Sequence, residues 1–234
     1  GDCNDLTIDA GADLTFILGT VNVAGNFTDN AGTIVIDEGK LDITGDASIP
    51  RNFTINQIAG ELEVDGTLTL GGALYTTTNN GVIDCNGTYN ATGTINLGPS
   101  ANIELGGTVT SLGDLDDAEG TVTYDLAGNQ TVLSDTYYNL TIKYNNANCT
   151  KSAGGNITCN GDFSDESSSG ISLYDLGTYT HVTQGATDIN EHLYFTTGVY
   201  DANGSFTALG ATVTITNTIG ILKLAGTVAS LGSL

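Results

Sequence analysis

Methionine and tryptophan are absent from this chain of 234 residues, proline occurs twice, and lysine and arginine together number only five. Also missing is the Ala/Leu/Glu/Lys mixture of helical proteins, since the chain instead contains 32 glycines and 36 threonines. Glycine and threonine are poor helix formers. The composition therefore excludes helical bundles and folds with crossover helices.

The shortage of basic residues also limits the partners. Against five Lys and Arg stand 27 Asp and Glu, which gives a net charge of −22. Such a chain repels nucleic acid and anionic lipid, so we expect no nucleic-acid partner. No apolar run approaches the roughly 18 residues of a membrane span, and no apolar leader is present. We therefore expect no membrane insertion and an extracellular, cell-surface location, with any export signal already removed.

A seven-residue pattern, Gly-x-apolar-x-apolar-x-Gly, recurs about every 20 residues, a period that indicates a repeat protein. It starts at Gly19, Gly39, Gly60, Gly81, Ala101, Gly120, Tyr138, Gly155, Gly177, Gly198 and Gly220. Alternate residues of a strand face opposite sides, so the apolar third and fifth positions predict one buried face. The same spacing places Tyr179 and His181 inward and Thr123 outward.

A period of this size leaves room for short strands and tight turns but not for a crossover helix. We therefore predict an all-β, right-handed parallel β-helix of about 11–12 coils, forming a single domain over residues 1–234. The alternative is an antiparallel β-sandwich, which would show turns every 8 to 12 residues or so and no fixed longer period.

A longer similarity is superimposed on the short one and predicts an internal duplication, in which residues 81–115 match residues 198–234. The segment 120–132, together with Tyr137-Tyr-Asn-Leu-Thr-Ile142, resembles repeats of β-helical surface and adhesin-like proteins of bacteria and archaea. The resemblance implies extracellular display. It implies no catalytic residue.

Two of the cysteines and one histidine are interpreted as core residues rather than as parts of a reactive site. Cys85 and Cys159 lie in the predicted inward positions four coils apart, too far for a disulfide. A bridge between Cys149 and Cys159 stays open, and the pairing of Cys3 is undetermined. His181 is expected to be a satisfied core histidine, and His192 has no evident partner. We expect no enzymatic activity and no organic cofactor.

Calcium is the one cofactor for which the sequence offers ligands, because this ion prefers carboxylate oxygens on loops. The candidate ligands are Asp114, Asp116, Asp117 and Glu119. A second acidic segment, 162–166, also offers carboxylates for calcium. The aligned acids Asp42, Glu63, Asp84 and Glu104 are interpreted as a solvated outer face.

Nine Asn-x-Ser/Thr sequons make glycans possible partners in an exported protein of an archaeon or a eukaryote. The candidate asparagines are Asn26, Asn52, Asn86, Asn90, Asn129, Asn139, Asn148, Asn156 and Asn203. Frequent threonine in alternating strands also raises the number of sequons by chance.

The two ends of the predicted solenoid show no polar cap, although exposed strand edges pair readily unless they are covered. We therefore expect a structural protein, a subunit of a surface filament, sheath or stalk whose copies join head to tail. The residues expected at the joint are Leu6 and Ile8 in the first coil and Leu222 and Leu224 in the last. The competing hypothesis is an adhesin segment that binds carbohydrate or another cell surface.

Overall fold

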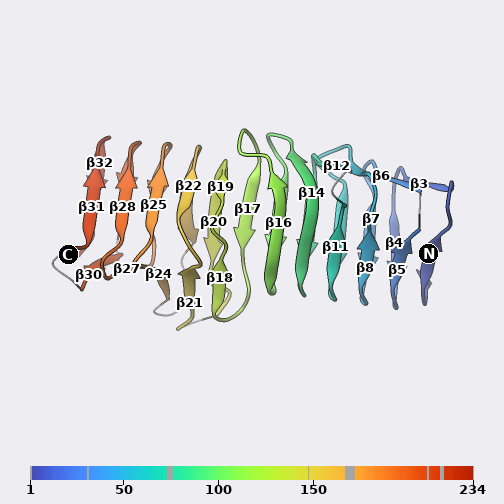
Figure 1. Ribbon diagram of the computed structural model, residues 1–234, viewed down its shortest axis with the longest axis horizontal. Coiled ribbons are helices and arrows are strands. Elements are labelled where there is room, and N and C mark those ends of the chain that lie inside the picture. The colour runs from blue at the N-terminus through green and yellow to red at the C-terminus, as the bar shows by residue number, and fades with distance from the viewer. Residues whose placement is uncertain are drawn as a thin grey trace. The chain divides into compact units, whose positions relative to one another are not determined.

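The protein is an all-β parallel solenoid of about 11 coils of roughly 20 residues each, as its computed structural model shows (Figure 1). The structure describes residues 2–30, 32–72, 76–146, 148–166, 172–209, 211–216 and 219–233. No helix occurs among them, and their neighbouring strands pair in parallel. The parallel solenoid predicted from the period is thus confirmed, and the antiparallel sandwich is wrong. Over the described ranges, no helix of a length and hydropathy suited to crossing a membrane is found.

The chain divides into two compact units, Gly1–Thr121 and Val122–Leu234. In the first unit, each coil contributes three short strands to three columns. The first column contains β1 (Asp2–Cys3), β4 (Thr20–Val23), β7 (Lys40–Ile43), β10 (Glu61–Val64), β13 (Val82–Cys85) and β15 (Asn102–Leu105). The second contains β2 (Leu6–Ile8), β5 (Phe27–Asp29), β8 (Ala47–Ile49) and β11 (Leu68–Leu70), and the third β3 (Asp13–Phe16), β6 (Thr33–Ile36), β9 (Phe53–Ile55) and β12 (Thr76–Asn79). Two longer strands, β14 (Tyr89–Leu97) and β16 (Val109–Leu115), continue both of these columns.

The period read from the sequence is in register throughout the first column. Leu62 is paired with Leu41 on one side and with Ile83 on the other, and Ile83 with Ile103. All four side chains are fully buried. Each such burial contributes about 1.5–3 kcal/mol, which explains why a strict alternation of apolar and polar residues fixes the register.

The second unit also has three strands per coil, arranged in three sheets. One contains β17 (Thr121–Tyr124), β20 (Asn139–Lys143), β23 (Phe163–Glu166), β26 (Thr187–Asp188), β29 (Phe206–Thr207) and β32 (Val228–Ser230). Another contains β18 (Gln130–Val132), β21 (Thr150–Ala153), β24 (Leu173–Gly177), β27 (His192–Phe195) and β30 (Thr212–Ile215). The third contains β19 (Thr136–Tyr137), β22 (Ile157–Cys159), β25 (Thr180–Thr183), β28 (Val199–Ala202) and β31 (Ile221–Leu224).

The predicted single column of repeats is wrong in the second unit. Leu140 is paired with Phe163, whereas Ile157 lies in a different sheet, opposite His181. Tyr179, expected inward, is 40% exposed, and Thr123, expected outward, is buried. Every strand column of a solenoid alternates apolar and polar residues, so a period alone does not tell one column from another when coil lengths vary.

Stacked glycines form one corner of each unit because neighbouring backbones approach too closely there for a side chain. A Cβ added to Gly87 would fall on the carbonyl oxygen of Gly66, and one added to Gly107 would fall on that of Gly87. The corner between β31 and β32 repeats the arrangement, with Gly226 against Gly204. The repeated glycines of the sequence pattern therefore serve close approach.

Asparagine and aspartate side chains beside the glycine corner tie each coil to the next. In the first unit, Oδ1 of Asp5 accepts a hydrogen bond from the Asn26 N–H at 2.8 Å, and Oδ1 of Asn26 accepts one from the Asp46 N–H at 2.9 Å. In the second, Oδ1 of Asn139 accepts from the Asp162 N–H at 2.8 Å. These bonds satisfy backbone donors at the corners, where the strand ladder is interrupted.

The two segments predicted to be duplicates share an unusual local structure. Ser111 Oγ and Ser230 Oγ each accept a hydrogen bond at 3.2 Å from a glycine N–H two residues later. Those glycines, Gly113 and Gly232, have positive φ values of 76° and 62°. Both segments also contain a register shift in their pairing with the preceding coil. The duplication itself and the single-domain organisation stay predictions.

Candidate functional site

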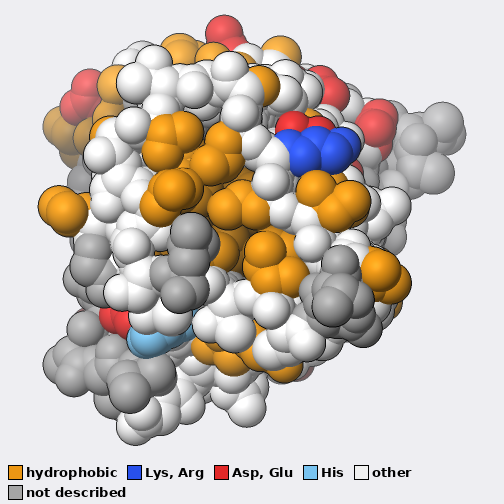
Figure 2. Space-filling view, turned by 90° about the vertical axis from the view of Figure 1, so that its left-hand side faces the viewer, with side chains coloured by type: hydrophobic (Ala, Val, Ile, Leu, Met, Phe, Trp, Pro, Cys, Tyr) orange, Lys and Arg blue, Asp and Glu red, His pale blue; other side chains and the backbone are white. Residues whose placement is uncertain are grey.

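The most distinctive surface of the second unit is its end face, formed by β30, β31 and β32. Hydrophobic side chains gather in the middle of this face, which is turned toward the viewer in Figure 2. The exposed apolar residues of this last coil are Ile215, Ile219, Ile221, Val228 and Leu231. Leu222 and Leu224, expected at a joint from the sequence, are half-buried in β31. A strand placed on this face would bury apolar surface.

Backbone groups at this end face are oriented for strand pairing. The Ile221 N–H bonds to Gly198 O at 3.0 Å and the Ala225 N–H to Ala202 O at 2.9 Å. Since the peptide groups of alternate residues point to opposite edges of a strand, those of Leu222 and Leu224 point away from β28. The edge of β30 differs, because the Val213 N–H already donates to Ser233 O at 2.9 Å.

A second candidate surface lies in the first unit, where β1, β2 and β3 are the terminal strands of their sheets. Leu6 is half-buried there, and Ile8 is buried. The Leu6 N–H donates to Asn26 O at 3.0 Å, and Ile8 O accepts from the Asn30 N–H at 2.9 Å. The peptide N–H and C=O of Thr7 therefore point to the outer edge of β2.

Charge differs between the two end surfaces. Lys223 on β31 is half exposed and lies 3.3 Å from the carboxylate of Asp201 in the preceding coil. The first coil instead exposes aspartates, including Asp2, whose Oδ1 accepts a hydrogen bond from Asn22 Nδ2 at 2.6 Å. One end thus carries a base and the other carries acids.

The outward acids of the first column form the stack expected from the sequence. Asp42, Glu63, Asp84 and Glu104 are register partners in successive coils. Ligand atoms of Glu61, Glu63 and Asp84 lie within 4.8 Å of one another. Lys40 pairs with Glu63 and with Glu61, the latter at 3.0 Å. Burial lowers the pKa of Lys40, but its bonds to both glutamates outweigh burial and raise it above its usual value.

The structure places the predicted calcium ligands on the surface at the end of β16 and just after it, without bringing them together. Asp114, Asp117 and Glu119 are exposed, and the half-buried Asp116 accepts a hydrogen bond from the Ala118 N–H at 2.9 Å. Among the described residues, no three of these four carboxylates converge as those of Glu61, Glu63 and Asp84 do. Calcium at this loop stays a prediction.

Most of the sequon asparagines lie where a glycan could be accommodated. Exposed are Asn26, Asn52, Asn86, Asn129, Asn148, Asn156 and Asn203, and half-buried are Asn90 and Asn139. Several of them use Oδ1 to bind the next coil, as Asn156 does with the Thr180 N–H at 3.0 Å. A glycan is attached through Nδ2, so these ladder bonds are compatible with modification.

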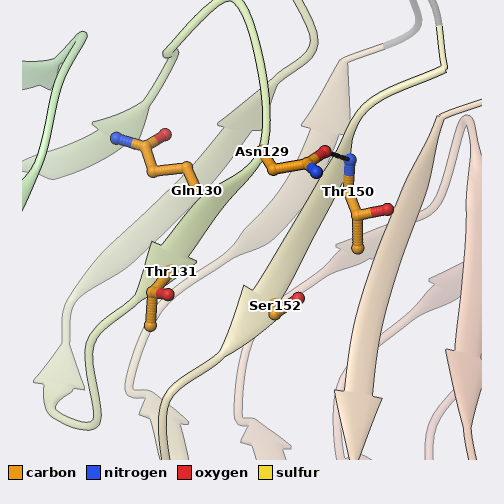
Figure 3. Close-up of a pocket in the computed structure, with 5 residues that line it drawn as sticks. All are labelled: Asn129, Gln130, Thr131, Thr150 and Ser152. Atoms are coloured by element: carbon orange, nitrogen blue, oxygen red, sulfur yellow. Dashed lines mark hydrogen bonds between the residues drawn. The ribbon is translucent and has the colours of Figure 1, made fainter.

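A surface pocket of about 390 Å³ lies over β18 and β21 (Figure 3). The residues that line it are Asn129, Gln130, Thr131, Thr150 and Ser152, all of which have polar side chains. Behind it, the fully buried Lys151 donates from Nζ to Gln130 Oε1 at 2.7 Å and to Leu126 O at 2.8 Å. Burial lowers the pKa of Lys151 to about 8. The lysine holds the strands behind the pocket and is withdrawn from its surface.

Cys85, Cys159 and His181 are buried core residues, as expected, whereas Cys3 is half-buried. All four cysteines are free thiols, and Cys85, Cys149 and Cys159 are buried. His181 is fully buried, and its ring contacts Tyr174 Oη at 2.9 Å and Cys159 Sγ at 3.5 Å. Burial lowers the pKa of His181 to about 3, so the ring is neutral at physiological pH. This geometry shows a structural histidine.

Sequence reasoning missed a buried acidic cluster in the second unit. The segment 162–166, interpreted as a loop, includes strand β23, and its Asp165 is fully buried. Burial raises the pKa of Asp165 to about 7, with backbone bonds from Asn190 and Glu191 opposing and the charges of Glu191 and Asp188 adding to the shift. Tyr144 and Glu191 are also buried. The available signal was the spacing, because Asp165 follows Phe163 by two residues and so shares the inward face of β23.

Comparison with protein-family models, with curated proteins and with solved structures found no significant match to this chain.

Proposed function

We propose that this protein is a non-catalytic, extracellular structural subunit whose copies stack head to tail into a filament, sheath or stalk. The observation that carries the proposal is the apolar end face of β30–β32, with outward-pointing peptide groups on β31. Burial of its side chains would add roughly 25 cal/mol per Å² to the pairing of the backbones. A parallel strand from another solenoid would pair with the outward peptide groups of β31 and cover the apolar side chains, as in strand addition to a sheet edge.

The extracellular part of the proposal is supported by composition and by surface chemistry. A net charge of −22 with few basic residues suits a display protein that avoids nucleic acid and anionic lipid. Seven of the nine sequons have exposed asparagines, so glycans on the outer faces would leave the end faces of the coils available.

The test compares an end-face substitution with a matched substitution elsewhere. Val228→Asp places a charge on the 43% exposed Val228 of the end face, and Ile58→Asp places one on the 69% exposed Ile58 at an outer turn. We expect the wild type and Ile58→Asp to form filaments and Val228→Asp to remain monomeric. Electron microscopy and light scattering measure the difference. A wild type that stays monomeric at high protein concentration and high salt contradicts the proposal.

Proline at Thr7 provides a second test from the other end. It removes an N–H that points away from β5, so it deletes a donor for a neighbouring subunit without deleting a bond inside the first coil. We expect Thr7→Pro to give soluble subunits whose circular dichroism matches that of the wild type.

The polar pocket over β18 and β21 favours the second candidate function, an adhesin segment that binds carbohydrate. Its amide and hydroxyl lining is suited to sugar hydroxyls. This function would be established instead if the wild-type protein is monomeric and binds glycans, and if the double variant Thr131→Ala and Ser152→Ala does not bind them.

A further inference from the structure

The two end surfaces also specify how one subunit meets the next, an inference that rests on the proposed head-to-tail assembly. We propose that β1 of one copy pairs with β31 of the preceding copy, with Asp2 opposite Lys223 and Cys3 opposite Leu224, and that β2 follows on β32. The sequence alone predicts a different pairing, in which β2 of one copy lies on β31 of the preceding copy.

The edge of β30 decides between these two arrangements. Because β1 precedes β2 as β30 precedes β31, placing β2 on β31 would put β1 on β30. That edge is occupied, since Ser233 bridges to Thr212, and its N–H and C=O bond to Ala211 O and the Val213 N–H. In the proposed joint, the next strand of the solenoid therefore pairs with β31, and β1 of the incoming copy is that strand.

Peptide orientation fixes the register. The Ala24 N–H donates to Cys3 O at 2.9 Å, so the peptide groups of Cys3 face β4 and those of Asp2 face the open edge. A parallel partner must then present outward groups on both sides of the residue opposite Asp2. Leu222 and Leu224 present them, and the residue between them is Lys223.

Side-chain chemistry matches at both positions of this register. Asp2 and Lys223 are exposed on the outer side, whereas Cys3 and Leu224 are half-buried on the inner side. Lys223 already contacts Asp201, so an incoming Asp2 would complete an acid–base–acid column. The molecule uses a related arrangement at Lys40, which pairs with Glu61 of the following coil.

The native Cys3 allows a direct test. Register partners in adjacent parallel strands lie within the Cα separation of a disulfide, about 4.4–6.8 Å. In filaments of Leu224→Cys, mild oxidation should therefore yield a ladder of covalent oligomers on non-reducing gels. Leu222→Cys is the matched control, displaced by two residues on the same strand, and should not crosslink. Adding Cys3→Ser to Leu224→Cys should abolish the ladder.

The outcomes separate the register from the assembly. Filaments that crosslink through Leu6→Cys with Leu222→Cys in a Cys3→Ser background, and not through Leu224→Cys, overturn the register and leave the proposed function standing. Protein that forms no filaments at all contradicts the proposed function. Filaments of Leu224→Cys that do not crosslink also overturn the register, once oxidation of free thiols has been verified by mass spectrometry.

Discussion

At the scale of the residue, buried titratable side chains make the stability of this protein depend on pH, and Asp165 is one of them. Its pKa of about 7 lies above the ordinary value of 3.8 because burial disfavours the carboxylate. The folded protein therefore holds a proton that the unfolded chain releases. This contribution to stability is complete below about pH 4 and is lost as the pH rises to about 7, at up to about 1.4 kcal/mol per pH unit.

Asp165→Asn should remove this dependence, because the amide keeps an acceptor and a donor without a charge. We expect the variant to be more stable than the wild type at pH 8, with the difference shrinking toward pH 4, in thermal or denaturant unfolding. The neighbouring exposed Glu166→Gln is the control and should leave the pH profile unchanged. A parallel pair of profiles for wild type and Asp165→Asn would contradict the assigned burial.

The inward register of the first unit is tested by one charge on each face of its strands. Val64→Asp would bury an unpaired carboxylate among fully buried neighbours and should cost ~4 kcal/mol or more, enough to prevent folding of the unit. Ser48→Asp, on the exposed side of β8, should change the melting temperature little. Thr123, which the sequence placed outward, is unsuitable as the control because it is buried.

At the scale of the element, the glycine corner limits which sequences can stack. A methyl group at Gly66 would meet the carbonyl oxygen of Gly45 at less than contact distance, whereas the space around Gly128 is open. Gly66→Ala should therefore destabilise the first unit by about 1–3 kcal/mol, and Gly128→Ala should be neutral in the same unfolding assay. Equal effects of the two substitutions would show that backbone entropy, and not close approach, explains the glycines.

The elements that sequence reasoning predicted best are those with constant coil length. In the first column, Leu41, Leu62 and Ile83 follow one another at a nearly fixed spacing, and burial alone specifies their register. In the second unit the period fitted the wrong residues, since Ile157 stands in a separate sheet from Leu140. Alternation was correct at Leu140 and Ile157, which are both buried, whereas Tyr179 and Thr123 were also assigned to the wrong face.

The candidate surfaces were predictable to a similar extent. Leu222 and Leu224, both half-buried in β31, followed from the repeat. The bond between Ser233 and β30, which changes the inferred joint, was not visible, because it depends on a register shift in β32. Asp165 was missed because acidic residues were assigned to loops by their type. Its position two residues after Phe163 instead places it on the inward face of β23.

At the scale of the whole molecule, net charge opposes the proposed assembly. Copies that each carry −22 repel one another, while the joint itself is mainly apolar contact and backbone pairing. Screening by salt should therefore lower the protein concentration at which filaments form, as light scattering at low and high NaCl would measure. The single Asp2–Lys223 pair would be weakened by the same salt, but it is small beside the repulsion of all the other charges. Filaments that dissolve as NaCl is added would contradict this balance.

The stacking of coils also has a mechanical consequence. In each unit the strands lie across the stacking direction and their hydrogen bonds lie along it, so a pull at the ends would load one ladder after another. Coils would then peel off singly, each of roughly 20 residues releasing about 70 Å of slack chain. Within a stalk, a unit pulled in this way would lengthen in steps of one coil for as long as the joints between copies hold.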